Sequence, residues 1–294
     1  MRFAVTTFQR VFDTVPNRDV VGLERLVRGL TTFLVKPKVA DAVAREVERI
    51  EAAWRSFKAD GYAPGKYGSR LAQAQRRAEL EGDAGAAERE FRHLIREVKA
   101  APKRELRLWS PTLYPAGAKR GGERVAHLSC LVLDYDVGLH IGEAAERFEE
   151  FFHIVHTTWS HTPDHPKFRL ILPLAEPVHP ADWRRVYTWA EDRSGRAVDP
   201  TGKSLGTTFA LPAVPAADRP RIAYSQPGPL LDARLEGLLE HRTDPCPEGI
   251  EPHEPNHFRI EIPGHATVSG SLDPGPESEG APEDPWDAPF PWSQ

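Results

Sequence analysis

The stretch LSCLVLDYD at residues 128–136 decides how the fold of this chain is interpreted. Its first six residues are apolar or small, and a run of that length predicts a buried strand. Side chains alternate between the two faces of a strand, so we expect Asp134 and Asp136 on one face, about 7 Å apart. Two like charges at the end of a buried strand repel each other and lose hydration, and a divalent cation relieves both costs. The acid pair therefore predicts an oxygen-rich site for Mg²⁺ or Mn²⁺, with a turn or a helix cap as the alternative interpretation.

The composition limits the class of protein. The chain has 294 residues, enough for one large domain or two small ones. Its apolar runs are too short to span a bilayer, and its first residues lack the pattern of a signal peptide. The two cysteines are Cys130, in the predicted strand, and Cys246, in a proline-rich segment, which argues against a disulfide framework or a cysteine-type zinc site. We expect a cytoplasmic protein without a membrane partner.

The charge is distributed unevenly along the chain. The net charge is −5, yet residues 243–294 alone carry 11 acidic residues and one Arg, together with 11 of the 28 prolines. This composition predicts a folded domain over residues 1–242 and a largely disordered tail over residues 243–294. The mildly basic domain permits binding to nucleic-acid phosphates, and the acidic tail could recruit a partner protein.

The periodicity of apolar residues predicts a mixture of helices and strands. We expect strands at 3–8, 128–133, 154–161, 168–174, 197–199, 209–212 and 221–224, and helices at 20–34, 39–58, 142–153 and 180–193. Residues 68–100 are rich in Ala, Arg and Glu, which predicts a helical hairpin inserted into the domain. The order shows no regular βαβ repeat, so the fold class that fits best is α+β.

Three sequence features follow one another in a fixed order. They are the acid pair Asp134 and Asp136, the segment TWSHTPDHPKFRLILPL at residues 158–174, and Asp199 after a short apolar stretch. This order resembles the archaeo-eukaryotic primase superfamily, and within it the primase-polymerases of phages and plasmids. The segment WSPTLY at residues 109–114 is also similar to that family, and the resemblance covers roughly residues 105–225.

The resemblance implies a fold and a metal site. The implied fold is an α+β catalytic core with an antiparallel sheet, similar to that of RNA-recognition motifs, flanked by helices. Asp134, Asp136 and Asp199 would be the carboxylates that bind Mg²⁺ or Mn²⁺. The family's Ser-x-His motif contacts the phosphates of the incoming nucleotide. Here Ser160 and His161 lack the intervening residue and an arginine follows at Arg169, so the resemblance implies His161 or Arg169 in that role.

One serine and four basic residues complete the expected site. Ser160, Lys167 and Lys203 are expected near the nucleotide, and Lys119 and Arg120 near the template or the triphosphate. Arginine suits a phosphate because its donors are forked and permanently charged.

The function implied by the resemblance is that of a DNA primase-polymerase in plasmid, phage or mobile-element replication. It would join ribo- or deoxyribonucleotides to a primer on a single-stranded DNA template by two-metal nucleotidyl transfer. A helicase or a single-strand-binding protein could dock on the acidic tail. Two alternatives are a catalytically silent replication-initiation or single-strand-binding module, and a metal-dependent nuclease that uses the same acids.

Two competing motifs are weaker. The segment Gly202-Lys203-Ser204 suggests a phosphate loop, but the first glycine of that motif is replaced by Ala197. Four histidines between residues 153 and 165 suggest zinc, but the predicted hairpin separates them, so a zinc site is not expected.

Overall fold

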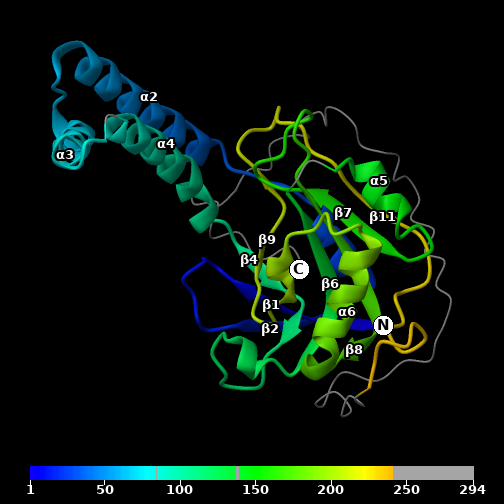
Figure 1. Cartoon of the computed structure of the whole chain (residues 1–294). Helices are drawn as coiled ribbons and strands as arrows, with labels where there is room; N and C mark the ends of the chain where they lie inside the picture. The colour runs from blue at the N-terminus through cyan, green and yellow to red at the C-terminus, as the bar shows by residue number, and fades with distance from the viewer. Residues whose placement is uncertain (84, 137–138, 241–294) are drawn as a thin grey trace, which may run out of the picture. The chain divides into compact units, whose positions relative to one another are not determined.

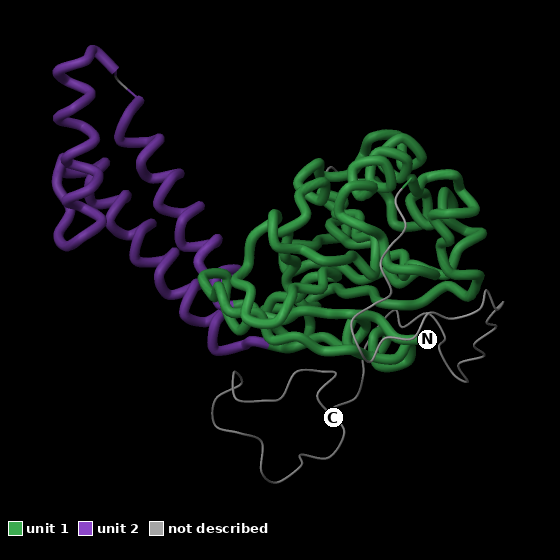
Figure 2. The backbone as a smooth tube through the Cα atoms, turned by 90° about the horizontal axis from the view of Figure 1, so that it is seen from below, with its two compact units in different colours: residues 1–35, 106–294 green, residues 36–105 purple. Residues whose placement is uncertain are grey.

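The computed structural model describes residues 1–83, 85–136 and 139–240, and it divides the chain into two compact units. Unit 1 contains residues 1–35 and the chain from Leu106 onward, and unit 2 contains residues 36–105 (Figure 2). Unit 2 therefore begins at residue 36, well before residue 68, where we expected the helical insertion to begin. The tail predicted for residues 243–294 lies outside the described residues.

The main sheet of unit 1 has five antiparallel strands in the order β11-β7-β8-β6-β5 (Figure 1). Their bounds are Thr112–Leu113 for β5, His127–Tyr135 for β6, His153–Thr157 for β7, Phe168–Val178 for β8 and Ala223–Gln226 for β11. The apolar run at 128–133 forms the buried β6, as its pattern predicts, and Asp134 is the last residue but one of this strand. With helices packed on an antiparallel sheet, the fold is α+β.

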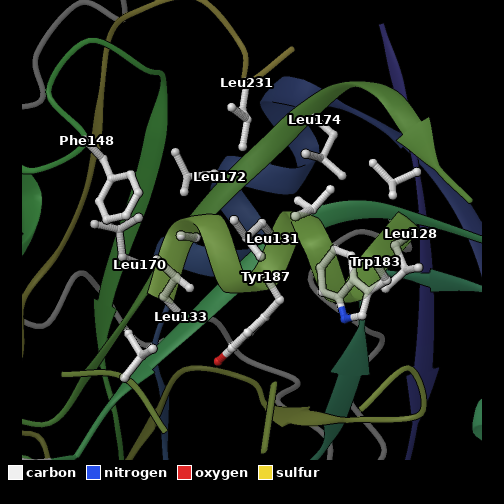
Figure 3. Packing of buried hydrophobic residues seen from close by; sticks show 14 of the residues in the cluster. Leu128, Leu131, Leu133, Phe148, Leu170, Leu172, Leu174, Trp183, Tyr187 and Leu231 are labelled. Atoms are coloured by element: carbon white, nitrogen blue, oxygen red, sulfur yellow. The ribbon is translucent and has the colours of Figure 1, made fainter. Parts of the chain in front are cut away.

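Two helices cover one face of this sheet, α5 (Ile141–Glu146) and α6 (Pro180–Arg193). Proline at the first position suits the start of α6, because it has no N–H to leave unpaired. The side chains of α6 that we expected on its apolar face are buried: Trp183, Val186, Tyr187 and Ala190. Figure 3 shows Trp183 and Tyr187 among the leucines of β6 and β8, so this core fixes α6 against the strand that carries Asp134.

A second apolar cluster covers the opposite face of the main sheet. It is formed by α1 (Leu23–Thr31) and by a smaller antiparallel sheet in the order β2-β1-β4-β9. The bounds of these strands are Arg2–Phe8 for β1, Asn17–Gly22 for β2, Leu108–Ser110 for β4 and Phe209–Ala210 for β9. Because side chains alternate along β6, Cys130 and Val132 belong to this cluster and Leu131 and Leu133 to the helix side.

The helix expected over residues 20–34 is wrong at both ends. Residues up to Gly22 belong to β2, the helix spans Leu23–Thr31, and residues 34–35 form β3 (Leu34–Val35). Val20 and Val21 fit a helical or a strand pattern equally, and pairing with β1 decides between the two.

The boundaries after Asp136 also differ from the expectation. The helix expected at 142–153 ends at Glu146, because Phe151 and Phe152 are buried in opposite clusters, which one helix face cannot achieve. The strand expected to reach residue 161 ends at Thr157. The strand expected at 209–212 starts as predicted but ends at Ala210, as β9. A strand that we did not expect, β10 (Ala213–Val214), follows it, and β11 begins two residues later than expected.

Unit 2 consists of three helices with a core of their own. They are α2 (Pro37–Asp60), α3 (Gly65–Glu81) and α4 (Ala86–Arg104). α2 and α3 each end at a glycine in the left-handed conformation, Gly61 and Gly82, which terminates a helix at little steric cost. The expected hairpin over 68–100 corresponds to α3 and α4.

The chain leaves unit 1 and returns to it at neighbouring points. The N–H of Leu34 donates to the carbonyl of Pro212 at 3.0 Å, and the N–H of Leu211 donates to the carbonyl of Arg107 at 2.9 Å. Two consecutive residues, 211 and 212, therefore hold both ends of the connection to unit 2. Within the described parts of the chain, no helix is long and apolar enough to cross a membrane.

Candidate functional site

A polar row crosses the main sheet near the end of β6. Asp134 of β6 lies opposite Arg169 of β8, which lies opposite His156 of β7. Residues opposite each other in antiparallel strands share a face, so these three side chains lie on the face that carries Val132. A carboxylate, a guanidinium and an imidazole therefore lie side by side near the ends of three strands that are otherwise largely apolar.

Arg169 is held by three contacts. Its Nε and Nη2 donate to Oδ2 of Asp134 at 3.2 and 3.1 Å, and its Nη1 donates to the carbonyl of Ala210 at 2.8 Å. Its guanidinium also lies over the ring of Phe209, 5.4 Å from the centroid. The side chain is 11% exposed. We predicted a phosphate contact for Arg169, and the structure instead directs most of its donors to Asp134 and to the backbone of β9.

Asp134 keeps one oxygen without a partner. Its Oδ2 accepts from Arg169, whereas its Oδ1 is buried and has no hydrogen-bond partner among the described residues. A buried carboxylate oxygen without a partner is costly, because it has lost its hydration. Oδ1 of Asp134 is therefore a carboxylate oxygen that can accept from, or coordinate, a further group.

Asp136 is more exposed than Asp134. Its Oδ1 lies 3.2 Å from Nζ of Lys167, and its side chain is 47% exposed compared with 21% for Asp134. Lys167 stands at the end of the loop before β8, so the two acids are paired with two cations from neighbouring positions. One carboxylate of the pair is thus fixed inside the protein and the other faces solvent.

The strand stub expected at Asp199 is wrong. Asp199 is the cap residue of a short 3-10 helix, η2 (Pro200–Lys203), and its Oδ1 accepts from the N–H of Thr201 at 2.8 Å. Its own N–H nevertheless donates to the carbonyl of Asp134 at 2.8 Å, and its carbonyl accepts from the hydroxyl of Tyr187. Asp199 is therefore held beside β6 by hydrogen bonds to its backbone.

His161 lies in the loop between β7 and β8. Its Nδ1 accepts from the N–H of Lys167 at 3.3 Å, which ties it to the residue that pairs with Asp136. Burial lowers the pKa of His161, so its ring is neutral at pH 7 and its proton resides on Nε2. His161 therefore presents a neutral N–H donor on the side of the site that carries Lys167.

The remaining residues that we expected near the nucleotide or the template are Lys203, Arg120, Ser160 and Lys119. Lys203 pairs with Glu191 of α6 at 2.6 Å. Arg120 donates to the carbonyl of Val11 and to the hydroxyl of Thr208, at 3.0 and 2.9 Å, so it joins two loops. Ser160 is half-buried in the loop before His161, and Lys119 is exposed.

The sequence interpretation missed His156. We considered this residue only as a possible zinc ligand, but it is fully buried beside Arg169, with Nδ1 bound to the carbonyl of Thr157 at 3.1 Å. Its Nε2 has no hydrogen-bond partner among the described residues. Burial, with a smaller contribution from the charge of Arg169, lowers the pKa of His156 to about 3. The register of β7 and β8, which sequence patterns do not supply, was needed to find it.

This shift predicts a pH dependence of stability. Between about pH 6.5 and about pH 3 the unfolded chain protonates His156 and the folded chain does not, so acid favours unfolding. Across that range we expect His156 to remove about 1.4 kcal/mol of unfolding free energy for each pH unit. The stability advantage of wild type over His156→Gln should shrink with this slope in urea unfolding as the pH falls. His165→Gln, at an exposed turn position, is the control; an equal slope for both variants would contradict the assignment.

The carboxylates suit a hard divalent cation by type but are not gathered as a finished cage. Among the described residues, no group of three or more His, Cys, Asp or Glu side chains is arranged to hold a metal ion. Asp134 offers the buried Oδ1, Asp136 is exposed, and Asp199 is fixed to the same strand end. Oxygen donors of this kind match Mg²⁺ or Mn²⁺, and the unpartnered oxygen is where such an ion would be favoured most.

Comparisons with known proteins give a distant likeness. No family model matches this chain, and no curated protein matches it. Among solved structures, the chain is similar to the AEP domain of the primase-polymerase of cyanophage S-2L, with a TM-score of 0.35 and 11% sequence identity. The alignment covers 48% of this chain and 74% of that one. The function proposed below rests on the carboxylates and their neighbours.

Proposed function

We propose that this chain is a metal-dependent nucleotidyltransferase of the primase-polymerase type, which extends or starts a primer on single-stranded DNA. The observation that carries this proposal is the state of Asp134. One of its oxygens is fixed by Arg169, and the other is buried without a hydrogen-bond partner among the described residues. The backbone carbonyl of the same residue accepts from the N–H of Asp199. A carboxylate held in this way is prepared to bind a cation without first reorganising.

Each of the neighbouring residues has a distinct role in this proposal. Asp134, Asp136 and Asp199 would hold one or two Mg²⁺ or Mn²⁺ ions, which when bound make a 3′-hydroxyl more acidic and stabilise the charge on a triphosphate. Arg169 acts as a positioning residue, because its donors are directed to Asp134 and Ala210.

We assign the phosphate-binding side of the site to the loop before β8. Lys167 carries the positive charge there, and His161 supplies a neutral N–H donor next to it. On this proposal, Lys167 would leave its ion pair when Asp136 holds a cation, and its ammonium would then bind a phosphate oxygen.

One observation favours a second function, a catalytically silent module that binds single-stranded DNA. Asp134 and Asp136 are both already neutralised by a basic neighbour, Arg169 and Lys167. A site balanced in this way does not need a metal to relieve the repulsion between its acids. The two functions differ in whether the ion pair between Asp136 and Lys167 opens when metal and nucleotide are present.

The test is nucleotide incorporation by the purified full chain. A labelled primer on a single-stranded template, and an unprimed template, are incubated with ribo- or deoxyribonucleotides and Mg²⁺, Mn²⁺ or a chelator. We expect incorporation with either metal and none with the chelator, because the charge on the triphosphate is then left without its cation.

The outcomes separate the candidate functions. Binding of the template without incorporation under any metal would contradict the proposed reaction and favour the silent module. Degradation of the template without incorporation would instead identify a nuclease.

A further inference from the structure

Unit 2 carries a cationic stripe along α4. The stripe consists of Arg92, Arg96, Lys99 and Lys103, all of which are exposed. Positions separated by four, seven and eleven residues lie on one face of a helix, so the four charges form a line about 16 Å long. A helix face of one charge sign is either a solvated surface or a binding surface, and the neighbouring contacts decide between these alternatives.

The acids of unit 2 do not neutralise the stripe. Glu90 and Glu97, on the other flank of α4, both pair with Arg70 of α3 at 2.7 Å. Among the described residues, Lys99 and Lys103 have no ion-pair partner, and Arg96 donates only to the carbonyl of Arg92. Glu90 and Glu97 therefore join α4 to α3, and Arg96, Lys99 and Lys103 are left without an acidic partner among the described residues.

Among the residues that the structure describes, Arg92 is the one member of the stripe with an acidic partner. Arg92 pairs with Glu88, one turn earlier on α4, at 2.5 Å. Both side chains are more than half exposed, so this pair is weak and easily exchanged for another anion.

The cations of α2 are interspersed with acids. Lys38, Arg45 and Arg49 lie on one face of α2, but Arg49 pairs with Glu46 at 2.9 Å. Arg55 and Lys58 lie on other faces of the helix. Asp41, Glu48 and Glu51 lie between them in the sequence. The exposed charges of α2 are therefore mixed in sign, whereas the α4 stripe from Arg96 to Lys103 has no acidic partner among the described residues.

We propose that this stripe binds the phosphate backbone of DNA without reading its sequence. A row of cations on a rigid helix complements a regular row of phosphates, and such contacts gain affinity by releasing counterions. The apolar face of α4, which includes Phe91, Leu94 and Val98, is packed into the core of unit 2 and cannot insert into a membrane. This binding surface lies outside the carboxylate site, and it does not depend on the proposed transfer reaction.

The test measures the DNA affinity of the full chain against salt. The stripe variant carries Arg92→Gln, Arg96→Gln, Lys99→Gln and Lys103→Gln, which are exposed substitutions with good helix propensity. The control variant carries Lys38→Gln, Arg45→Gln, Arg55→Gln and Lys58→Gln, which change the net charge of the same unit equally. Binding to a labelled duplex and to a labelled single strand is followed by fluorescence anisotropy between about 50 and about 200 mM salt.

We expect the stripe variant to lose at least about tenfold in affinity at low salt. Four phosphate contacts contribute about 3.6 to the salt slope on a duplex and about 2.8 on a single strand. The form of DNA on which the stripe variant loses this slope is the form that the stripe binds. The control variant should keep most of the wild-type slope.

Equal slopes for the two variants would overturn the proposal, because only net charge would then matter. Stripe-dependent binding to anionic lipid vesicles with unchanged DNA binding would overturn it in favour of a membrane. Nucleotide incorporation at saturating DNA is measured separately, so a failed reaction and a failed DNA surface are distinguishable.

Discussion

Asp134→Asn should reduce nucleotide incorporation by about a thousandfold or more while leaving the chain folded. Metal stabilisation of a transferring phosphoryl group is worth several kcal/mol, and an amide in place of this carboxylate removes the charge that attracts the ion. The chain should stay folded, because an amide oxygen can still accept a hydrogen bond from Arg169 as Oδ2 of Asp134 does. Its unfolding free energy should fall, because the charge of Arg169 loses its counter-charge. The measurement is single-turnover primer extension with Mg²⁺ and with Mn²⁺.

Asp164→Asn is the matched control for this variant. Asp164 is exposed in the turn between β7 and β8, so the substitution makes the same change in net charge away from the buried carboxylate. We expect wild-type incorporation from it. If Asp134→Asn remains folded and keeps its activity, the carboxylate at the end of β6 is not the metal ligand.

Arg169→Met should destabilise the chain by about 2–3 kcal/mol. Removing one partner of a mostly buried ion pair leaves the other charge uncompensated, and Asp134 is only 21% exposed. The carbonyl of Ala210 loses its donor as well. Methionine preserves much of the apolar stem of Arg169 but removes the guanidinium from the ring of Phe209, so the loss reports the charge, the hydrogen bonds and this ring contact. Urea unfolding measures the loss, and primer extension should fall with it.

A double-mutant cycle separates the ion pair from general damage. Arg169→Met combined with Asp134→Asn should be more stable than Arg169→Met alone, because the uncompensated charge is then removed. Arg234→Met is the control, since its ion pair with Glu176 is exposed on both sides and should contribute no measurable stability. Wild-type stability of Arg169→Met would show that Arg169 does not position Asp134.

The elements with strong local patterns were predictable from sequence. The apolar run before Asp134 forms β6, and the helical spacing of Trp183 and Tyr187 places both in the core, as expected. The start of η2 also had a local signal, because an aspartate followed by a proline, Asp199 and Pro200, is typical of a helix cap and a first helical residue. We gave the apolar stretch before it more weight and predicted a strand.

The partners of the site residues were not predictable in the same way. Arg169 lies opposite both Asp134 and His156, and that arrangement depends on the register of three strands, which turns and packing set together. Similarly, Lys203 is adjacent to the site in sequence but pairs with Glu191 of α6, a contact that only the tertiary fold creates. Residue types therefore indicated the chemistry, and register determined which donor faces which acceptor.

The hydrogen bonds of residues 211 and 212 have a consequence for how this chain can change in evolution. Leu34 and Arg107 are both held by this dipeptide, so the two ends of the helical unit are fixed next to each other on one scaffold. The entropy of closing a loop grows only slowly with its length, so a connection anchored in this way tolerates segments of very different size. A lineage could lengthen, shorten or exchange the helices between these anchors without moving the strand that presents Asp134.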